Sequence, residues 1–272
     1  MGVFLDDAVS AAIASFRERM EAAPAASLER ALAGCPEPPD FKTAVSRGGG
    51  GVKIIAEVKR MSPSAGSIRE EVRVADLVRA YSDAGAAAVS VLTSDYKFGG
   101  TIADLVEAER ASAVPLLRKD FIVDAYQVLE SRVYGASAVL LVAAALTVER
   151  IRALEGYAHE LGMAALVEAH DRADIEKALD AGALLMGINN RDLATLDVDP
   201  GTTERLLPHI PEGRTVVSES GIGTRDQVMR MEELGIDALL IGEALMRAGE
   251  PGAMLRQLLG EVDESCGLRS AG

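Results

Sequence analysis

Charged side chains stand at the ends of several short apolar segments in this sequence, and the first case is Glu57 with Lys59. They follow the apolar residues 54–56 and precede a loop rich in serine, proline and glycine. Residues two apart in a strand point to the same face, so the carboxylate and the ammonium project side by side. Such a pair is either an ion pair that closes a core or part of a catalytic group.

The same pattern recurs at the ends of four later apolar segments. Their polar residues are Lys119 with Asp120, Glu168, Asn189 with Arg191, and Glu219 with Ser220. Taken singly, each charged residue could belong to a structural ion pair. Burying so many charges in a structural core is costly, and the set as a whole therefore favours a site for acid–base chemistry.

Two glycine-rich turns follow the last two apolar segments. Gly221 follows Ser220 in "SESGIG", and Gly242 precedes Glu243 in "LLIGEALM". Glycine amides at the start of a helix bind phosphate in many barrels. We therefore expect a phosphate site here, to which Glu243 contributes only its backbone amide because its carboxylate would repel the anion.

The elements that carry these residues alternate regularly after residue 51. Eight short apolar segments, each followed by a helical pattern, are typical of a (β/α)8 TIM barrel in the α/β class. A doubly wound sheet fits less well, because no G-x-G-x-x-G follows the first strand. The carboxyl ends of barrel strands meet at one face, so the polar residues are expected to gather there.

The first 50 residues form a predicted helical extension of the barrel. Apolar residues at positions 5, 9, 13, 16 and 20 lie at helical spacing, and the glycine-rich residues 47–51 precede the first strand. We expect a single domain over residues 1–272, with residues 1–50 as the extension and residues 261–272 as a loose tail.

The composition argues against several classes of function. The formal net charge is −14 without a basic stripe, so no nucleic-acid partner is expected. No run of 18 apolar residues and no secretory signal occurs in the sequence, which predicts a cytoplasmic protein without a membrane partner. Cys35 and Cys266 suggest no disulfide framework. The three histidines lack metal-ligand spacing, and His170 is expected to be a solvated loop residue.

Seven motifs together resemble those of the indole-3-glycerol-phosphate synthase family. They are "IIAEVKRMSPSAG", "VLTSDYKFGG", "LLRKDFIVDAYQVLESR", "LVEAH", "GINNRDL", "VSESGI" and "LIGEALM". The resemblance extends from the N-terminal helices to about residue 260. It implies a barrel with an added N-terminal helical segment, and no cofactor or metal. The implied reaction belongs to tryptophan biosynthesis: 1-(2-carboxyphenylamino)-1-deoxy-D-ribulose 5-phosphate closes its ring, loses carbon dioxide and water, and gives indole-3-glycerol phosphate.

The resemblance also implies roles for the polar residues. Lys119 matches the general acid, and neighbouring cations are expected to lower its pKa. The other catalytic positions are Glu57, Lys59, Glu168, Asn189 and Ser220. The substrate-binding positions are Ser62, Phe98, Arg191, Glu219, Gly221, Gly242 and the amide of Glu243. Lys97 replaces a second aromatic residue of many members, which leaves the shape of that pocket wall open. The division of acid and base work among Glu57, Lys59 and Glu168 is also left open.

Three other functions remain alternatives at this stage. A phosphoribosylanthranilate isomerase would need a cysteine general base at the end of the first strand, where Glu57 and Lys59 lie. A Schiff-base aldolase would use Lys119 as a nucleophile. A non-catalytic sugar-phosphate-binding protein would need the glycine turns but no acid–base set. Association with other enzymes of the tryptophan pathway is left open.

Overall fold

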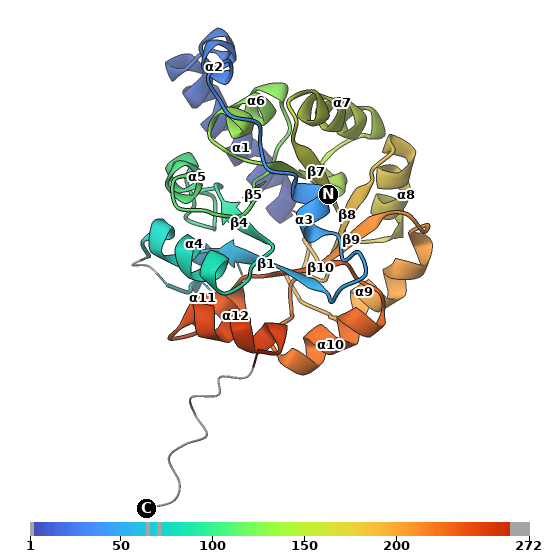
Figure 1. The fold of residues 1–272 in the computed structure, drawn as a ribbon. Coiled ribbons are helices and arrows are strands. Elements are labelled where there is room, and N and C mark those ends of the chain that lie inside the picture. Colours follow the sequence, from blue (N-terminus) through green and yellow to red (C-terminus); the bar gives the residue numbers. More distant parts are fainter. Residues whose placement is uncertain (1–2, 64–65, 70–71, 262–272) are drawn as a thin grey trace, which may run out of the picture.

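The structure is a closed parallel barrel, seen in a computed structural model that describes residues 3–63, 66–69 and 72–261 (Figure 1). Its strands are β1 (Lys53–Val58), β4 (Ala88–Leu92), β5 (Leu116–Lys119), β6 (Ala138–Val142), β7 (Ala164–Ala169), β8 (Leu185–Asn189), β9 (Thr215–Glu219) and β10 (Ala238–Ile241). Pairing of β1 with both β4 and β10 closes the barrel. The predicted (β/α)8 fold is confirmed.

Helices surround the barrel in chain order, as Figure 1 shows. They are α4 (Val74–Asp83), α5 (Ile102–Glu109), α6 (Ala125–Val133), α7 (Val148–Glu160), α8 (Arg172–Ala181), α9 (Gly201–Leu206), α10 (Arg225–Glu233), α11 (Glu243–Arg247) and α12 (Pro251–Leu259), with the 3-10 turns η1 (Ala143–Ala145) and η2 (Leu207–His209). Local side chains cap the N-termini of two of these helices, α6 and α10. Asp124 and Thr224 each form a capping box with a glutamine three residues later.

The alternation of strand side chains divides the core into two layers. In β1, Ile54, Ala56 and Val58 face outward and pack with the surrounding helices. Ile55 faces inward, where it joins an apolar cluster that fills the barrel. Because side chains alternate along a strand, Glu57 shares the inward face of Ile55 and points into the barrel mouth.

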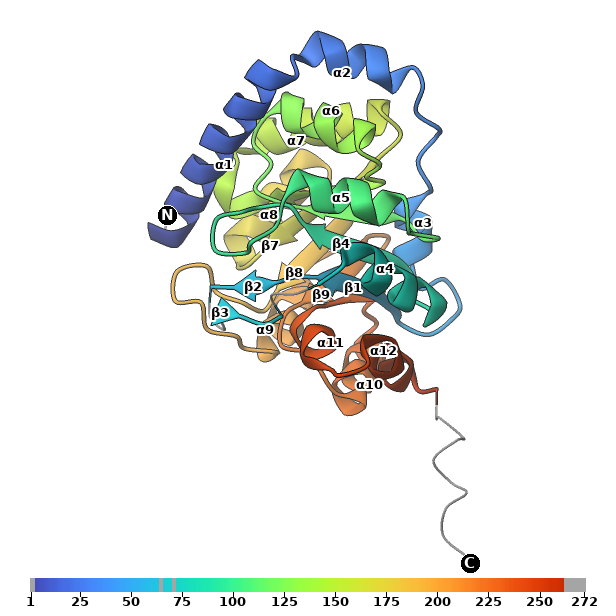
Figure 2. The ribbon, with the colours of Figure 1, turned by 90° about the vertical axis from the view of Figure 1, so that its left-hand side faces the viewer.

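Three helices precede the barrel and reach both of its ends (Figure 2). The long helix α1 (Val3–Ala22) lies across the carboxyl ends of the strands, and α2 (Ala25–Leu32) packs on α6. The short helix α3 (Phe41–Val45) lies at the opposite end, where the fully buried Phe41 and Val45 close the barrel interior. Apart from Glu261, the predicted loose tail lies outside the described residues.

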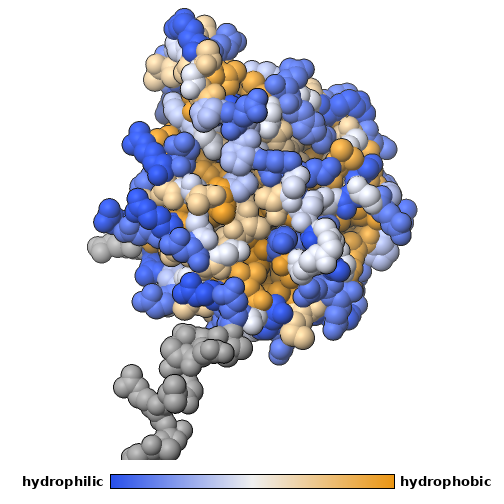
Figure 3. All heavy atoms as spheres, in the orientation of Figure 1, coloured by the Kyte–Doolittle hydropathy of each residue, from blue (hydrophilic) through white to orange (hydrophobic). Residues whose placement is uncertain are grey.

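The remaining strands, β2 (Met61–Ser62) and β3 (Gly66–Ser67), form a small antiparallel hairpin directly after β1. Figure 3 shows the molecule in the orientation of Figure 1, with hydrophilic residues prominent around its outline and hydrophobic residues emerging between them. None of the helices in the described part of the chain is both long and apolar enough to cross a membrane.

Candidate active site

Four ionisable residues rise from the strands into the mouth of the barrel: Glu57, Lys119, Glu168 and Glu219. Each lies two positions after an inward-facing apolar residue of its own strand. Those apolar residues are Ile55, Leu117, Leu166 and Val217. Since inward-facing positions recur every second residue, the apolar interior and the charged mouth are parts of one pattern. The predicted convergence of the strand-end residues is found in the structure.

Short ion pairs connect these charged groups. The Nζ atom of Lys119 lies 2.7 Å from Oε2 of Glu168 and 3.0 Å from Oε2 of Glu219. Lys59 Nζ lies 2.8 Å from Oε1 of Glu57. Both lysine side chains are 13% exposed, whereas the three carboxylates are buried. The lysines therefore form the solvent-facing side of the cluster, where an incoming substrate meets them first.

Lys119 lies among carboxylates, whereas the sequence suggested cations beside it. Burial alone would lower the pKa of the Lys119 ammonium, but Glu168, Glu219 and Glu57 outweigh burial and raise that pKa above its ordinary value. The expected lowering of the Lys119 pKa is therefore wrong. The acidic neighbours come from other strands, so residues near Lys119 in the sequence do not reveal them.

The two carboxylates beside Lys119 prefer opposite protonation states. Burial alone would raise the pKa of Glu168, but Lys119 and His170 hold it well below its ordinary value. Burial raises the pKa of Glu219 to about 8, against the opposing effect of Lys119 and with the support of the Glu168 charge. At neutral pH, Glu168 is therefore an ionised group that can accept a proton, and Glu219 is largely a neutral acid.

Asn189 and Ser220 form a polar link between the ends of β8 and β9. The Asn189 Oδ1 atom accepts hydrogen bonds from Ser220 Oγ at 2.8 Å and from the Arg191 backbone amide at 3.0 Å. Ser220 adopts a left-handed φ of 68°, which is uncommon for a residue with a side chain. The guanidinium of Arg191 donates to the Leu196 carbonyl at 2.9 Å. These contacts fix both loops beside the charged cluster.

A small cavity of about 80 Å³ lies directly above the cluster. Its wall contains all six predicted catalytic residues together with Ser62, Phe98 and Arg191, but not Glu219. It also contains Phe4 from α1 and Phe121 after β5. The Phe4 ring centroid lies 6.5 Å from that of Phe98 and 6.4 Å from that of Phe121. Ligand pockets usually exceed about 300 Å³, so a substrate must displace part of this wall to enter.

Phe4 was not among the predicted site residues. It lies just before the apolar stripe of α1, and only the docking of that helix across the mouth places its ring in the cavity. Lys97 does not line this cavity: its side chain is exposed, and its Nζ lies 5.9 Å from the centroid of the Tyr96 ring. The aromatic wall of this cavity therefore includes Phe4 beside Phe98, and Lys97 takes no part in it.

A second, more open hollow of about 450 Å³ adjoins the first beside the last two strands. Lys59, Arg191 and Ser220 line both hollows. The predicted phosphate residues Gly221, Gly242 and Glu243 line the second hollow only. The two hollows thus form one elongated site with an aromatic end, a charged middle and a glycine-rich end.

Two details of the glycine-rich end refine the sequence prediction. The amides of Gly223 and Thr224 donate to the Gln227 side chain at 2.9 and 3.1 Å, so this cap already uses them. The Glu243 carboxylate pairs with Arg247, whose Nε lies 3.0 Å away. Arg247, which the sequence prediction missed, thereby reduces the repulsion that Glu243 would exert on an anion.

Gly242 is needed for a reason that the sequence did not show. A Cβ atom at this position would overlap with Oε1 of Glu57. The absence of a side chain at Gly242 therefore makes room for the Glu57–Lys59 pair, in addition to leaving the second hollow open.

His170 lies inside the site, which corrects the expectation of a solvated loop residue. Its side chain is only 10% exposed. The Nε2 atom lies 3.1 Å from Oε1 of Glu168, and Nδ1 lies 3.4 Å from Oδ2 of Asp174. The spacing of two residues after Glu168 was the available signal for this contact.

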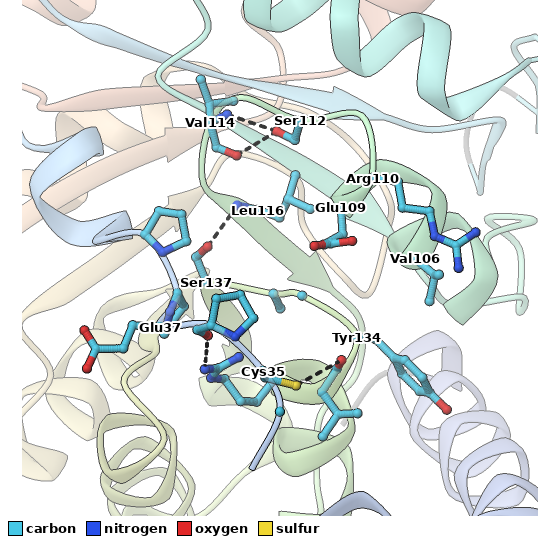
Figure 4. A pocket seen from close by; sticks show the side chains of 18 residues that line it. Cys35, Glu37, Val106, Glu109, Arg110, Ser112, Val114, Leu116, Tyr134 and Ser137 are labelled. Carbon is cyan, nitrogen blue, oxygen red and sulfur yellow. Dashed lines mark hydrogen bonds between the residues drawn. The ribbon is translucent and has the colours of Figure 1, made fainter. Parts of the chain in front are cut away.

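A larger hollow of about 590 Å³ lies at the opposite end of the barrel (Figure 4). Two serines of its wall are engaged locally: Ser137 Oγ accepts from the Leu116 amide at 3.4 Å, and Ser112 Oγ donates to the Val114 carbonyl at 2.6 Å. Cys35, at its edge, lies near the Val133 carbonyl. This hollow lies away from the strand-end acids and bases that converge in the mouth, so the mouth is the candidate active site. Among the described residues, no cluster suited to a metal ion is found.

A closed barrel whose acid–base groups converge at the carboxyl ends of its strands defines a (β/α)8-barrel enzyme. Comparison with known families assigns it further: the model described as indole-3-glycerol phosphate synthase matches residues 5–258. An indole-3-glycerol phosphate synthase of Dehalococcoides mccartyi strain CBDB1 is 48% identical over 239 residues, covering 87% of this chain and 92% of that protein. This chain belongs to the indole-3-glycerol phosphate synthase family, as its motifs indicated.

Other relatives with the same name are similar over much of the chain. The protein of Campylobacter curvus is 44% identical, covering 90% of this chain and 95% of its own length. The protein of Burkholderia vietnamiensis is 51% identical, with 75% and 78% covered.

Two solved structures show the fold alone. KGPDC from Streptococcus mutans has a TM-score of 0.58 at 12% identity, covering 76% of this chain and 95% of its own. A mandelate oxidase has a TM-score of 0.57 at 17% identity, covering 77% of this chain and 70% of its own.

Proposed function

We propose that this chain catalyses the reaction for which its family is named, the formation of indole-3-glycerol phosphate, and that the barrel mouth is its active site. The observation that supports this proposal is the elongated site with three chemically distinct regions: an aromatic end, a charged middle and a glycine-rich end. A carboxyphenylamino-ribulose phosphate has an aromatic ring, a ketone and a phosphate in the same order. The proposed substrate is therefore a phosphorylated small molecule that spans both hollows.

In this arrangement the aromatic ring occupies the inner cavity beside Phe98 and Phe4. The phosphate occupies the outer hollow, where Gly221, Gly242 and the amide of Glu243 surround it. Lys59 and Arg191, which line both hollows, lie between the two ends and offset the negative charge of the substrate. Ser62, on β2, completes the wall of the inner cavity.

The first step joins the ring to the sugar. The ring carbon that bears the carboxylate attacks the ketone carbon, and the Lys119 ammonium transfers a proton to the ketone oxygen as negative charge develops there. The bond to the carboxylate then breaks, carbon dioxide leaves, and its electron pair restores the aromatic ring. An alkoxide is a stronger base than an amine, so the raised pKa of Lys119 still permits this transfer.

The second step removes water. The new hydroxyl group takes up a proton and departs, and the neighbouring sugar carbon loses a proton to form the double bond of the indole. Glu168, held ionised by its neighbours, is the base that we assign to this carbon. Lys59, paired with Glu57 at 2.8 Å, supplies the proton to the departing hydroxyl group. Asn189 and Ser220, joined by a hydrogen bond of 2.8 Å, link the ends of β8 and β9 beside Glu219.

The rival functions fit the mouth less well. A Schiff-base nucleophile must be a neutral amine, whereas the carboxylates around Lys119 favour its ammonium form. An isomerase with a cysteine base finds no support in the position of Cys35, which lies at the other end of the barrel. Cys266 is outside the described residues. A cytoplasmic location, independence from cofactors and the absence of a nucleic-acid partner remain predictions.

The test is formation of indole fluorescence from 1-(2-carboxyphenylamino)-1-deoxy-D-ribulose 5-phosphate by the purified chain. We expect continuous production by the parent protein and a strong loss in Lys119→Met. The matched control is Lys42→Met, because Lys42 lies on α3 at the opposite end of the barrel and is absent from both hollows. Borohydride trapping of a ketose phosphate on Lys119, without any indole product, would instead identify an aldolase.

A further inference from the structure

Cationic groups contact the Glu168 carboxylate on both sides. Its Oε2 atom accepts from Lys119 Nζ at 2.7 Å, and its Oε1 atom lies 3.1 Å from His170 Nε2. The proposed chemistry uses Lys119, whereas the same chemistry leaves His170 without a role. Yet the His170 side chain is only 10% exposed, and its Nε2 atom lies within 3.1 Å of the Glu168 carboxylate.

The surroundings of His170 require a positively charged ring. A neutral imidazole carries a lone pair on one of its two nitrogens, and here each nitrogen faces a carboxylate, from Glu168 or from Asp174. A lone pair facing either carboxylate would be repelled, so only the doubly protonated ring suits both. Burial alone would lower the pKa of His170, but Asp174 and Glu168 outweigh it and raise the pKa to about 9.

Asp174 is itself fixed in position, so it can hold the ring. It lies in the first turn of α8, its carboxylate accepts from the His170 backbone amide at 3.2 Å, and its own amide donates to the Asp171 cap at 2.8 Å. Lys177, one turn later, lies 3.5 Å from the other carboxylate oxygen. Asp192, from the loop after β8, is the further charged group near enough to interact with His170.

We propose that His170 is a cationic positioning residue for Glu168, fixed by Asp174, which keeps Glu168 ionised and oriented when Lys119 gives up its proton. This inference rests on the proposed function. Once Lys119 is neutral, Glu168 has lost its nearest positive charge inside a buried site, where an unpaired carboxylate readily takes a proton. His170 stays charged at that moment, and Glu168 remains available as the base of the second step.

The test compares three replacements of His170 with one distant control. Glutamine keeps a hydrogen-bond donor without the charge, lysine restores a charge, and alanine removes both. His159→Gln is the control, because His159 is exposed at the end of α7. Circular dichroism and thermal unfolding establish that each variant is folded before kcat is measured from pH 5.5 to 9.

The expected result is a loss of activity that depends on pH. Without the imidazolium the pKa of Glu168 rises, so more of it is protonated at low pH. His170→Gln should lose kcat progressively as the pH falls, by about tenfold for each pH unit below the point at which Glu168 becomes protonated, and should approach the parent near pH 9. His170→Lys should recover part of the loss. A loss of equal size at every pH, or none in His170→Gln and His170→Ala, overturns the proposal.

A second measurement separates this inference from the proposed function. NMR titration of the His170 ring needs no substrate. We expect the ring of the parent protein to stay protonated well above pH 7, and the ring of Glu168→Gln to lose its proton at a lower pH. A parent that shows this coupling without making indole would refute the proposed reaction but leave the pairing of the His170 cation with Glu168 intact. A His170 ring that is neutral at pH 7 in the parent overturns the role proposed for His170.

Discussion

Single residues at the mouth begin in ion pairs that the substrate must rearrange. Lys119 lies 2.7 Å from Glu168 and 3.0 Å from Glu219, which leaves one of its three ammonium hydrogens for a ketone oxygen. Turning away from one carboxylate extends its reach. Glu219 is the easier partner to lose. Its pKa is raised to about 8, and its neutral form needs no counter-ion. We infer that Lys119 keeps Glu168 and turns from Glu219 toward the substrate.

Replacing Lys119 should affect turnover rather than binding. A general acid acts mainly in the transition state, so Lys119→Met is expected to lower kcat by about a hundredfold to ten-thousandfold while substrate still binds. Lys59→Met should lose both affinity and turnover, because Lys59 lines both hollows. Single-turnover stopped-flow absorbance and equilibrium binding of a reduced analogue that cannot cyclise distinguish the two effects. If Lys119→Met loses only affinity, Lys119 is a binding residue.

Glu219 should make the protein less stable as pH rises. Its pKa is about 8 in the folded protein, against an ordinary 4.5, so the folded state binds more protons than the unfolded state between these values. Stability is therefore lost progressively across this window. Glu219→Gln should unfold at the same temperature as the parent near pH 5 and a few degrees higher at pH 9. Equal unfolding temperatures at pH 9 would show that Glu219 ionises without cost.

Among the elements, α1 and β5 are connected by buried charges. The Arg19 guanidinium of α1 contacts both carboxylate oxygens of Glu130 on α6, at 2.6 and 3.0 Å. Glu130 also accepts from the fully buried Arg118 at 2.8 Å, and Arg118 contacts Asp120 at 2.9 Å. Residues 118 and 120 flank Lys119, so this chain of contacts joins the helix over the mouth to the strand that carries the proposed acid.

Arg19→Met should loosen α1 without unfolding the barrel. Glu130 keeps Arg118 as a partner, so we expect a loss of about 2 kcal/mol, the usual scale for a hydrogen-bonded contact to a charged group, together with a higher KM. Arg17→Met is the control, because Arg17 is exposed on the same helix. Thermal unfolding and steady-state kinetics measure both effects. Identical behaviour of the two variants would mean that the Arg19–Glu130 pair does not hold α1 in place.

The sequence predicted the strand-borne part of the site, because the period of two places Glu57, Lys119 and Glu168 on the inward face. It could not predict contacts that depend on how separate elements dock. Phe4 enters the cavity only because α1 crosses the mouth. His170 contacts Asp174 because the loop after β7 turns back onto the start of α8. Such contacts leave no periodic signal, and a spacing of two residues alone did not decide the environment of His170.

The whole molecule must attract a phosphorylated substrate despite a net charge of −14. A field of this sign slows the approach of an anion, so the site has to supply positive charge locally. Lys59, Arg191 and Arg247 line the outer hollow, and they face the region proposed for the phosphate. The two ends of the barrel therefore differ in function. The mouth carries the charged groups proposed for catalysis, whereas the base, closed by Phe41 and Val45, stabilises the fold by apolar packing.

Matched replacements of two phenylalanines test this division between the ends. Phe41 is 1% exposed in the barrel base, and Phe41→Ala should cost about 3–5 kcal/mol of stability with kcat/KM nearly unchanged in the folded protein. Phe4 is only partly buried and lines the catalytic cavity, so Phe4→Ala should cost less stability and lower kcat/KM. Chemical unfolding and steady-state kinetics on both variants give the comparison. The division fails if Phe41→Ala impairs catalysis as much as Phe4→Ala does, because packing at the base would then control the geometry of the mouth.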